Sequence, residues 1–357
     1  MEKFSQFRDR GTQIAPFLPI TPPRTTLQTL TGLLLFLLRL PLFLSLLLPY
    51  LLILQHLPIP ALLVLRKAIL WSVLLTSGIW WIDLQVENVK KGSLSRQPKS
   101  KLPTPGSVLI CTCTSPLDVL YLSAIFDPVF TVSAAGRRRV REVGVWGAIM
   151  AAFAPPSITP PPAAGGGTAG GGDEEITLAE LCKKYGDTRI IAVFPEATTT
   201  NGRGVLRFAP CLDTLPATVE IFPVSLRYSP ADVTTPIPET YGYTLFALLS
   251  RPTHCIRVRI GEVLRNDDDP LIPTKEEEEE EESSDSDTAT DEFARGGGGG
   301  AGEKKEDLTK MDKQSRLSER GAEALARIAR SKRVNLGVRE KIAFVEAWGR
   351  NKRSSRF

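Results

Sequence analysis

The chain has 357 residues, 42% of them hydrophobic, and its 44 basic and 40 acidic side chains give a formal net charge of +4 at pH 7. This length suffices for one domain of ordinary size with membrane or disordered segments beside it. A charge so nearly balanced gives no reason to expect a nucleic acid as partner. The five cysteines are odd in number and lack C-x-x-C spacing. The sequence therefore predicts neither a disulfide framework nor a metal site.

Residues 1–27 are expected to form a cytosolic N-terminal tail, and residues 28–83 a membrane hairpin. Gly32 to Leu54 is almost wholly apolar over 23 residues, enough to cross a hydrocarbon layer of about 30 Å as a helix. A second apolar stretch, Ile59 to Ile82, ends in tryptophans, which favour the headgroup level. Basic residues on both flanks favour a hairpin, or a helix with a re-entrant segment, over a single span. The alternative is a buried helical pair in a soluble core. His56, between the stretches, is expected at a helix end or interface.

Residues 84–265 alternate short apolar runs with helix-like segments. This pattern is typical of an α/β domain, a mixed sheet flanked by helices. Serine as N-cap, proline at the first helical position and an acid in the first turn predict a helix that begins after Ser115. We expect strands at Ser107–Thr112, Val129–Ser133, Arg189–Phe194, Val219–Tyr228 and His254–Val263, and further helices at Val140–Ala152 and Thr177–Tyr185.

Three segments of biased composition complete the expected organisation. Residues 154–172, rich in proline, alanine and glycine, are predicted to be a flexible insertion. Residues 266–310 are expected to be a disordered acidic and glycine-rich linker. Residues 311–357 are basic and are predicted to contain two helices, Gln314–Ser331 and Gly337–Trp348, the second with a docking stripe of Val338, Ile342, Val345 and Trp348.

The most specific string in the chain is VFPEATTTNGRGVL, residues 193–206. A buried strand ends in Phe-Pro-Glu, and the polar turn after it offers hydroxyls, an amide and a guanidinium beside one carboxylate. Ligands of α/β proteins commonly bind at such strand ends. A phosphate is the expected occupant, with Arg203 and Arg207 as donors of charge-assisted hydrogen bonds. The alternative is a polar turn without a ligand.

This string resembles the FPEGTxxNGxxLxxF block of the PlsC-like glycerolipid acyltransferases. Upstream, residues 113–118 (CTSPLD) resemble the HxxxxD motif of the same family, with Cys113 in the histidine position. The two blocks lie about 80 residues apart, as they do in the family. Two positions depart from the family pattern, since Ala197 replaces a glycine and Thr199 stands where many members have arginine. Within the family, the chain is most similar to the fungal enzymes that acylate lysophosphatidic acid with oleoyl-CoA.

The resemblance implies acyl-CoA-dependent acylation of a lysophospholipid, with lysophosphatidic acid as acceptor and phosphatidic acid as product. It implies a location on the endoplasmic reticulum membrane or lipid droplet surface, with the catalytic domain facing the cytosol. Membrane lipid, lysophospholipid and acyl-CoA are the expected partners, acyl-CoA serving as co-substrate without any cofactor or metal. The sequence indicates no oligomeric state. The residues implied are Cys113 and Asp118 as catalytic, and Phe194, Pro195, Glu196, Thr198, Thr199, Asn201, Gly202 and Arg203 as substrate-binding.

The cysteine at position 113 leaves three hypotheses open, because a thiol is a poorer base than imidazole at neutral pH. Cys113 could carry the acyl group as a nucleophile. Glu196 or Asp118 could suffice without a dedicated base. Activity could also be lost, leaving a lipid-binding or sorting module, in which Cys113 is merely a buried strand-end residue and Asp118 a helix-capping acid. Any enzyme requires that the two carboxyls converge on one pocket. His254 is expected to be an ordinary surface histidine.

Overall fold

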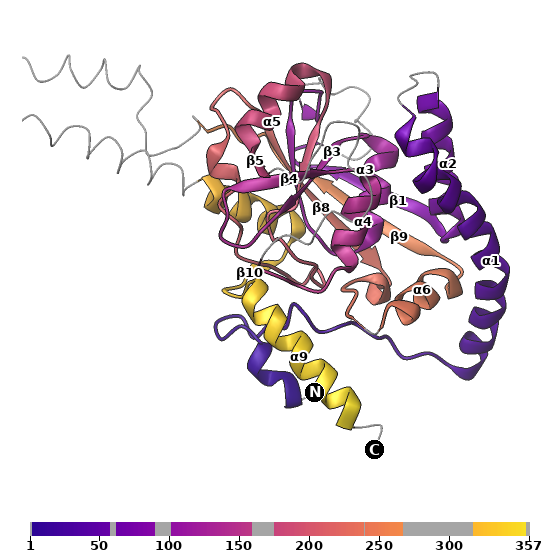
Figure 1. The fold of residues 1–357 in the computed structure, drawn as a ribbon. Coiled ribbons are helices and arrows are strands. Elements are labelled where there is room, and N and C mark those ends of the chain that lie inside the picture. Colours follow the sequence, from indigo (N-terminus) through magenta and orange to yellow (C-terminus); the bar gives the residue numbers. More distant parts are fainter. Residues whose placement is uncertain are drawn as a thin grey trace, which may run out of the picture.

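The computed structural model describes residues 2–57, 62–89, 101–158, 175–238, 240–266 and 317–354. Most of the expected insertion at 154–172 and nearly all of the expected linker at 266–310 lie outside these ranges. The described residues contain an eight-stranded mixed sheet in the order β1-β9-β8-β2-β6-β3-β4-β5, flanked by helices (Figure 1). The predicted α/β class is confirmed.

Four neighbouring strands in the centre of the sheet, β8, β2, β6 and β3, run parallel, while β9 and β4 pair antiparallel at their two sides. The carboxyl ends of the four central strands therefore meet at one edge of the sheet. A two-stranded sheet of β7 and β10 stands apart. The strands are β1 Ile79–Val86, β2 Val108–Cys111, β3 Val129–Ser133, β4 Arg139–Val143, β5 Glu175–Thr177, β6 Ile191–Val193, β7 Gly204–Val205, β8 Ile221–Ser229, β9 His254–Ile260 and β10 Lys332–Arg333.

The sheet has an apolar core on each face, because successive residues of its buried strands point to opposite sides. Leu109 packs with residues of α2, α3, α4 and α6 in one core, whereas Val108 and Ile110 pack with α5 and the helix at 317–329 in the other. The helices are α1 Thr26–Leu52, α2 Leu63–Thr76, α3 Pro116–Ile125, α4 Val145–Phe153, α5 Leu178–Tyr185, α6 Tyr241–Ser250 and α9 Val338–Ser354, with short 3-10 turns η1 Glu2–Phe7, η2 Leu54–His56, η6 Gly186–Thr188, η7 Leu212–Thr214 and η8 Ala231–Val233.

One predicted helix is partly wrong. Residues 140–143 of the expected Val140–Ala152 helix belong instead to strand β4, Arg139–Val143, which pairs antiparallel with β3. In this strand Val140 is 1% exposed between an exposed and a half-buried neighbour, and the strand lies between β3 and β5 in the sheet. Gly144 then caps α4, so the helix begins at Val145.

His254 is also placed differently from expectation, because it is buried rather than on the surface. It begins β9, is 1% exposed, and its Nε2 lies 2.9 Å from the carbonyl oxygen of Leu248. Burial lowers the pKa of its imidazole. His254 therefore acts as a packed structural residue.

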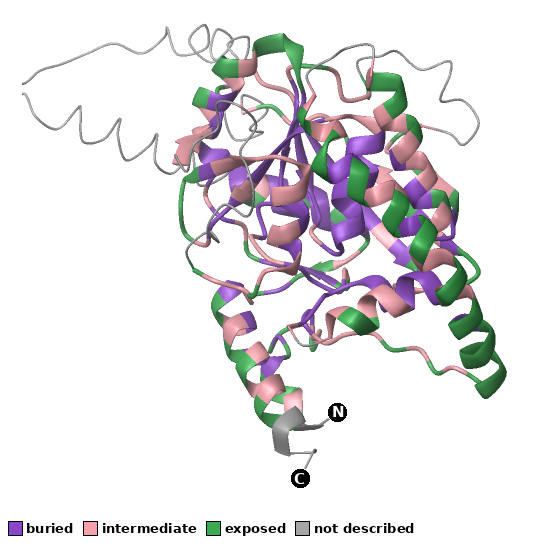
Figure 2. Ribbon diagram, turned by 45° about the vertical axis from the view of Figure 1, so that its right-hand side comes forward, coloured by how far each residue is buried: buried purple, intermediate pink, exposed green. Residues whose placement is uncertain are grey.

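The N-terminal apolar region forms two packed helices on the side of the domain. Thr26–His56 is the segment, among the described residues, that is long and apolar enough to span a membrane. Helix α2 has 14 residues and is about 21 Å long, too short to cross. Residues 79–82, expected in the second apolar stretch, begin β1 instead. The outer side of α1 carries exposed leucines (Figure 2), and the place of the two helices in a membrane stays a prediction.

The two ends of the described chain pack against each other below the sheet (Figure 1). Phe4 and Phe7 in η1 and Phe17 contact the ring of Phe344 in α9, at centroid distances between 5.4 and 6.1 Å. The predicted C-terminal helices are confirmed over the described residues, 317–329 and Val338–Ser354. This aromatic cluster fixes α9 beside the edge of the sheet where the central strands end.

Candidate active site

Cys113 and Asp118 lie where β2 passes into α3. The chain leaves the buried strand after Cys111 and turns through Cys113 and Thr114 into the helix. Ser115 is the N-cap of α3, Pro116 opens the helix, and the side chain of Asp118 completes the capping box. The predicted helix start is confirmed, and the capping geometry turns Asp118 back towards residues 113–115.

Asp118 is buried, 1% exposed, and its carboxyl holds this turn. Its Oδ2 accepts the N–H groups of Thr114 at 2.7 Å and Ser115 at 2.9 Å, while the hydroxyl of Tyr228, in β8, donates to Oδ1 at 2.5 Å. Burial raises the pKa of Asp118 to about 6, against the lowering effect of these hydrogen bonds. Asp118 is thus an anchor of the turn whose own oxygens are occupied.

Glu196 reaches the same turn from β6 and is 2% exposed. Its Oε1 accepts the N–H of Leu206 at 2.9 Å, and its Oε2 accepts the N–H of Cys113 in a long contact of 3.4 Å. Burial is the main cause that raises the pKa of Glu196 to about 7. The two carboxyls therefore converge on residues 113–115, but only Asp118 lines the pocket beside this turn, so the expected shared pocket is found for one carboxyl alone.

A pocket opens beside this turn, with about 480 Å³ of empty space including its mouth. Its polar side carries the thiol-bearing Cys113 and the carboxyl-bearing Asp118. Its other side is formed by small and apolar residues of β3 and α4. Of the predicted site residues, it unites Cys113, Asp118, Phe194, Thr198 and Thr199, beside Ser115, Val119, Thr131, Val132, Ser133, Ala148, Ala151, Ala152 and Ala197.

A second pocket, with about 830 Å³ of empty space, collects the remaining polar residues of the turn. Three arginines line it, Arg203, Arg227 and Arg257, together with Thr114 and Tyr228 from the neighbourhood of Asp118. The remaining lining residues are Ile20, Asn201, Gly202, Leu226, Ser229, Ala231, Thr234 and Cys255. Such a cluster of guanidinium groups suits an anion. Arg207, the other arginine predicted to serve a phosphate, is exposed and does not line this pocket.

Asn201 serves the fold as well as the second pocket. Its Nδ2 donates to the carbonyl oxygens of Ala15 at 2.8 Å and Leu18 at 2.9 Å, and so ties the N-terminal segment to the turn. Pro195 and Glu196 lie behind the first pocket rather than in its lining. The roles of the named residues in substrate binding stay predictions.

Cys113 is half-buried and carries a protonated thiol at neutral pH. Burial, and then the charges of Asp118 and Glu196, raise the pKa of this thiol well above its ordinary value, while Lys341 opposes the shift. A neutral thiol is a weak nucleophile and a poor proton acceptor. These surroundings favour a mechanism in which Cys113 is not the base.

Two residues of the site escaped the sequence analysis. Tyr228 belongs to a predicted strand, but nothing in that strand marks its bond to Asp118. Lys341, in α9, is buried at 2% exposure, and its Nζ donates to the carbonyl oxygen of Thr199 at 2.7 Å and to its Oγ1 at 2.6 Å. A basic residue in a basic C-terminal segment gives no signal of such burial.

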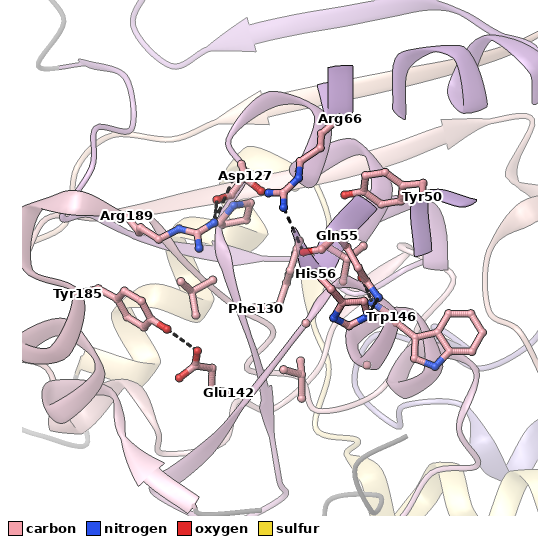
Figure 3. Close-up of a pocket in the computed structure, with 16 residues that line it drawn as sticks. Tyr50, Gln55, His56, Arg66, Asp127, Phe130, Glu142, Trp146, Tyr185 and Arg189 are labelled. Atoms are coloured by element: carbon pink, nitrogen blue, oxygen red, sulfur yellow. Dashed lines mark hydrogen bonds and ion pairs between the residues drawn. The ribbon is translucent and has the colours of Figure 1, made fainter. Parts of the chain in front are cut away.

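A third pocket, with about 750 Å³ of empty space, lies elsewhere in the fold and includes the residues just before β3 (Figure 3). The Nη2 atom of Arg189 pairs with Asp127 at 3.2 Å there, and the Nε of Arg66 donates to the carbonyl oxygen of Leu54 at 2.9 Å. His56 lines this pocket at the end of η2, so its expected position at a helix end is confirmed. The pocket contains none of the predicted site residues.

No group of three or more His, Cys, Asp and Glu side chains within the described ranges could hold a metal ion. An acyl-CoA thioester already carries an activated acyl group, so acyl transfer needs no further organic cofactor.

The site lies in a mixed sheet, where the side chains of Asp118 and Glu196 meet at the ends of the central strands. A family model described as Acyltransferase matches residues 93–227 and gives the class of this protein. The chain is 30% identical over 282 residues to a "Putative lysophosphatidic acid:oleoyl-CoA acyltransferase" of Schizosaccharomyces pombe, covering 76% of this chain and 86% of that protein. It is also 30% identical over 212 residues to "Lysophosphatidic acid:oleoyl-CoA acyltransferase 1" of Saccharomyces cerevisiae, covering 58% and 61%. The chain therefore belongs to the acyltransferase family of these fungal proteins, and its class is that of an enzyme. No solved structure matches it significantly.

Proposed function

We propose that this protein transfers an acyl chain from acyl-CoA to lysophosphatidic acid and releases phosphatidic acid and CoA. The ester C–O bond forms as the thioester C–S bond breaks, and the proton of the acceptor hydroxyl ends on the CoA thiol. The observation that carries the proposal is the pair of pockets on the Cys113–Asp118 turn, one partly apolar and one lined by arginines. The names of the two fungal relatives support the same substrates.

The pockets assign the parts of the substrates by chemistry. The small and apolar residues of α4, such as Ala148 and Ala152, suit the acyl chain and its thioester. The guanidinium groups of Arg203 and Arg227 suit the phosphate of the lysolipid. Since Thr114 lines the second pocket and Cys113 the first, the acceptor hydroxyl and the thioester would meet at this turn.

The acceptor assignment is tested with purified protein in micelles, labelled oleoyl-CoA and lysolipids with and without a net anionic headgroup. Lysophosphatidic acid should give product faster than lysophosphatidylcholine. Arg203→Ala should raise KM for lysophosphatidic acid by about tenfold, the order expected when one charge-assisted contact is lost. Arg207→Ala, an exposed arginine outside the pocket, is the matched control and should leave KM unchanged. Equal rates on both lysolipids, or equal effects of both variants, would contradict a phosphate site here.

The part played by Cys113 is tested by two substitutions. If the thiol is a nucleophile, Cys113→Ala abolishes turnover and acyl-Cys113 is trapped by mass spectrometry after mixing with oleoyl-CoA. If the thiol only fills space, Cys113→Ala retains the wild-type rate and no adduct forms. Cys113→His places the family's imidazole at this turn and should raise the rate, because a neutral imidazole accepts protons at pH 7.

We further propose that α1 and α2 hold the domain on the cytosolic face of the endoplasmic reticulum or on lipid droplets. The exposed leucines of α1 support attachment to a lipid surface, since a row of exposed apolar side chains is typical of a membrane contact. Fluorescence microscopy of the tagged protein beside markers of both compartments tests it, and an even cytosolic distribution would contradict it.

A further inference from the structure

The C-terminal helix contributes a charged group to the site. Lys341 lies outside residues 93–227, the region that the family model matches, and 142 positions from Thr199, which it contacts. Thr199 lines the same pocket as Cys113 and Asp118. The two hydrogen bonds from Nζ, to the carbonyl oxygen and the hydroxyl of Thr199, hold this wall of the pocket from behind.

The position of Lys341 is fixed by the fold rather than by a flexible side chain alone. Glu340 caps the start of α9 by accepting the N–H of Gly337 at 2.7 Å. One turn further on, Phe344 is 1% exposed among the aromatic rings of the N-terminal segment. Residues three apart on a helix share a face, so the packing of Phe344 points Lys341 into the protein. Just before α9, the N–H of Val334 donates to the carbonyl oxygen of Val205. The next residue, Leu206, donates its N–H to Glu196.

Burying the ammonium group of a lysine destabilises the folded protein unless hydrogen bonds or nearby negative charges compensate for the lost water. Within the described residues, Nζ of Lys341 forms no ion pair with a carboxylate, and it donates hydrogen bonds to the two oxygens of Thr199. An apolar side chain of similar length would fill the same space without the cost of desolvating an ammonium group. A role in packing therefore does not account for a lysine here.

Five ionisable groups lie around the turn, and Lys341 is joined to it through residues 199 and 200, because the N–H of Thr200 donates to the carbonyl oxygen of Cys113 at 2.8 Å. Burial lowers the pKa of Lys341 to about 8, and the charges of Cys113 and Glu196 oppose that shift. In return, the charge of Lys341 opposes the rise that burial causes in the pKa of the Cys113 thiol and of the Glu196 carboxyl. The group consists of Cys113 after β2, Asp118 in α3, Glu196 after β6, Tyr228 in β8 and Lys341 in α9.

We propose that Lys341 is a positioning residue of the acyltransferase site, which fixes Thr199 and brings a positive charge from the C-terminal helix to the turn around Cys113 and Glu196. The family histidine becomes positively charged when it accepts a proton, and a cysteine in its place cannot. Lys341 provides a cation near that position at neutral pH, because its pKa, although lowered to about 8, stays above 7. The kinetic test of this inference rests on the proposed acyl transfer, whereas its chemical test does not require that activity.

The kinetic test compares Lys341→Met, which keeps the length but removes the charge, with Lys341→Arg, which keeps the charge. Lys341→Met should lower kcat by about tenfold with little change in KM, and should move the acid limb of the pH–rate profile up by about one unit, because Glu196 loses its cation. Lys341→Arg should keep the wild-type limb. Lys183→Met, an exposed lysine of α5, is the control and should change nothing. An unchanged limb in a folded Lys341→Met protein overturns the proposal.

The chemical test requires no turnover and so separates this inference from the proposed substrate. The rate of alkylation of Cys113 by iodoacetamide is followed by peptide mass spectrometry as a function of pH in the full-length protein. Lys341→Met should slow this reaction by about tenfold at each pH below the thiol pKa, because a lower thiolate fraction reacts. Thr199→Val removes one of the two acceptors, serves if Lys341→Met does not fold, and should slow the reaction less. Equal rates in wild type and both variants overturn the proposal even if acyl transfer is confirmed.

Discussion

Ala197 occupies a backbone conformation that suits glycine. Its φ is +52°, in the left-handed region where a Cβ costs about 1–2 kcal/mol. This backbone conformation explains why the FPEGTxxNGxxLxxF block of the acyltransferase family has a glycine at this position. Ala197→Gly should raise the free energy of unfolding by about 0.5 kcal/mol after the greater flexibility of glycine in the unfolded chain is subtracted, and should therefore raise the midpoint of thermal unfolding.

The control for Ala197→Gly is Ala135→Gly, at a turn residue that is not among those with positive φ. That change should destabilise the protein by roughly 0.5–1 kcal/mol, because only the unfolded-chain effect remains. The same direction of change in both variants, by differential scanning fluorimetry, would show that strain at position 197 is absent.

Glu196 makes stability depend on pH in a defined window. Its pKa is raised from 4.5 to about 7 in the folded protein, mainly by burial. Between these values the folded chain binds more protons than the unfolded chain, so this group's contribution to stability falls as pH rises. The glutamine of Glu196→Gln cannot ionise. The free energy of unfolding of this variant, relative to that of wild type, should therefore rise by on the order of 2 kcal/mol between pH 4.5 and pH 7.

The exposed Glu319→Gln is the control, and its difference from wild type should stay constant over this range. Parallel pH curves for wild type and Glu196→Gln would mean that Glu196 ionises as freely in the folded state as in the unfolded state.

At the scale of elements, α3 depends on a tyrosine from the sheet. Tyr228→Phe removes a hydrogen bond to the buried carboxyl of Asp118 and should destabilise the protein by about 1–3 kcal/mol. The loss should be greater at pH 8 than at pH 5, because the lost bond favours the ionised carboxylate, whose pKa is about 6. Tyr241→Phe removes a bond to a neutral acceptor, the carbonyl oxygen of Phe153, and should cost about 0.5–1.5 kcal/mol without this dependence on pH. Equal losses at both pH values in chemical denaturation would contradict the assigned role of Tyr228.

Local signals predict most of the elements that build the site. The strand before Cys113, the capping box at Ser115 and the strand before Glu196 were all readable from the sequence, because apolar runs and caps act within a few residues. The sequence assigns strand β4 to the helix because Val140 and Val143 are three positions apart, a spacing that also suits a helix running on from Val145. Short-range patterns cannot separate two elements joined by a single glycine.

The partners that come from far along the chain could not be predicted. Apolar periodicity selects Val338, Ile342, Val345 and Trp348 in α9, and Val345 and Trp348 do pack on the aromatic cluster, but the buried side chains of Lys341 and Phe344 lie outside the predicted stripe. A pattern built on apolar residues excludes a buried lysine by definition. The bond from Tyr228 to Asp118 spans 110 positions and depends on the order of strands in the sheet, which a single sequence does not reveal.

At the scale of the whole molecule, the exposed side of α1 should determine attachment to lipid. Leu34 and Leu38 are 71% and 72% exposed on this helix. Leu34→Glu with Leu38→Glu should reduce sedimentation with phospholipid vesicles by at least about tenfold, since two apolar side chains lose their burial in lipid. Lys183→Glu lies on the other side of the sheet, changes the net charge by the same amount and should sediment like wild type. Equal binding of both variants would place the membrane contact elsewhere.

The contact between the chain ends also orders events during synthesis. Helix α1 precedes Lys341 in the chain and therefore leaves the ribosome first. A nascent chain can therefore meet a lipid surface while the wall behind Thr199 is still missing. On this schedule, with α1 bound to lipid as we propose, Lys341 completes the wall of the pocket after the chain has made its first contact with the lipid surface.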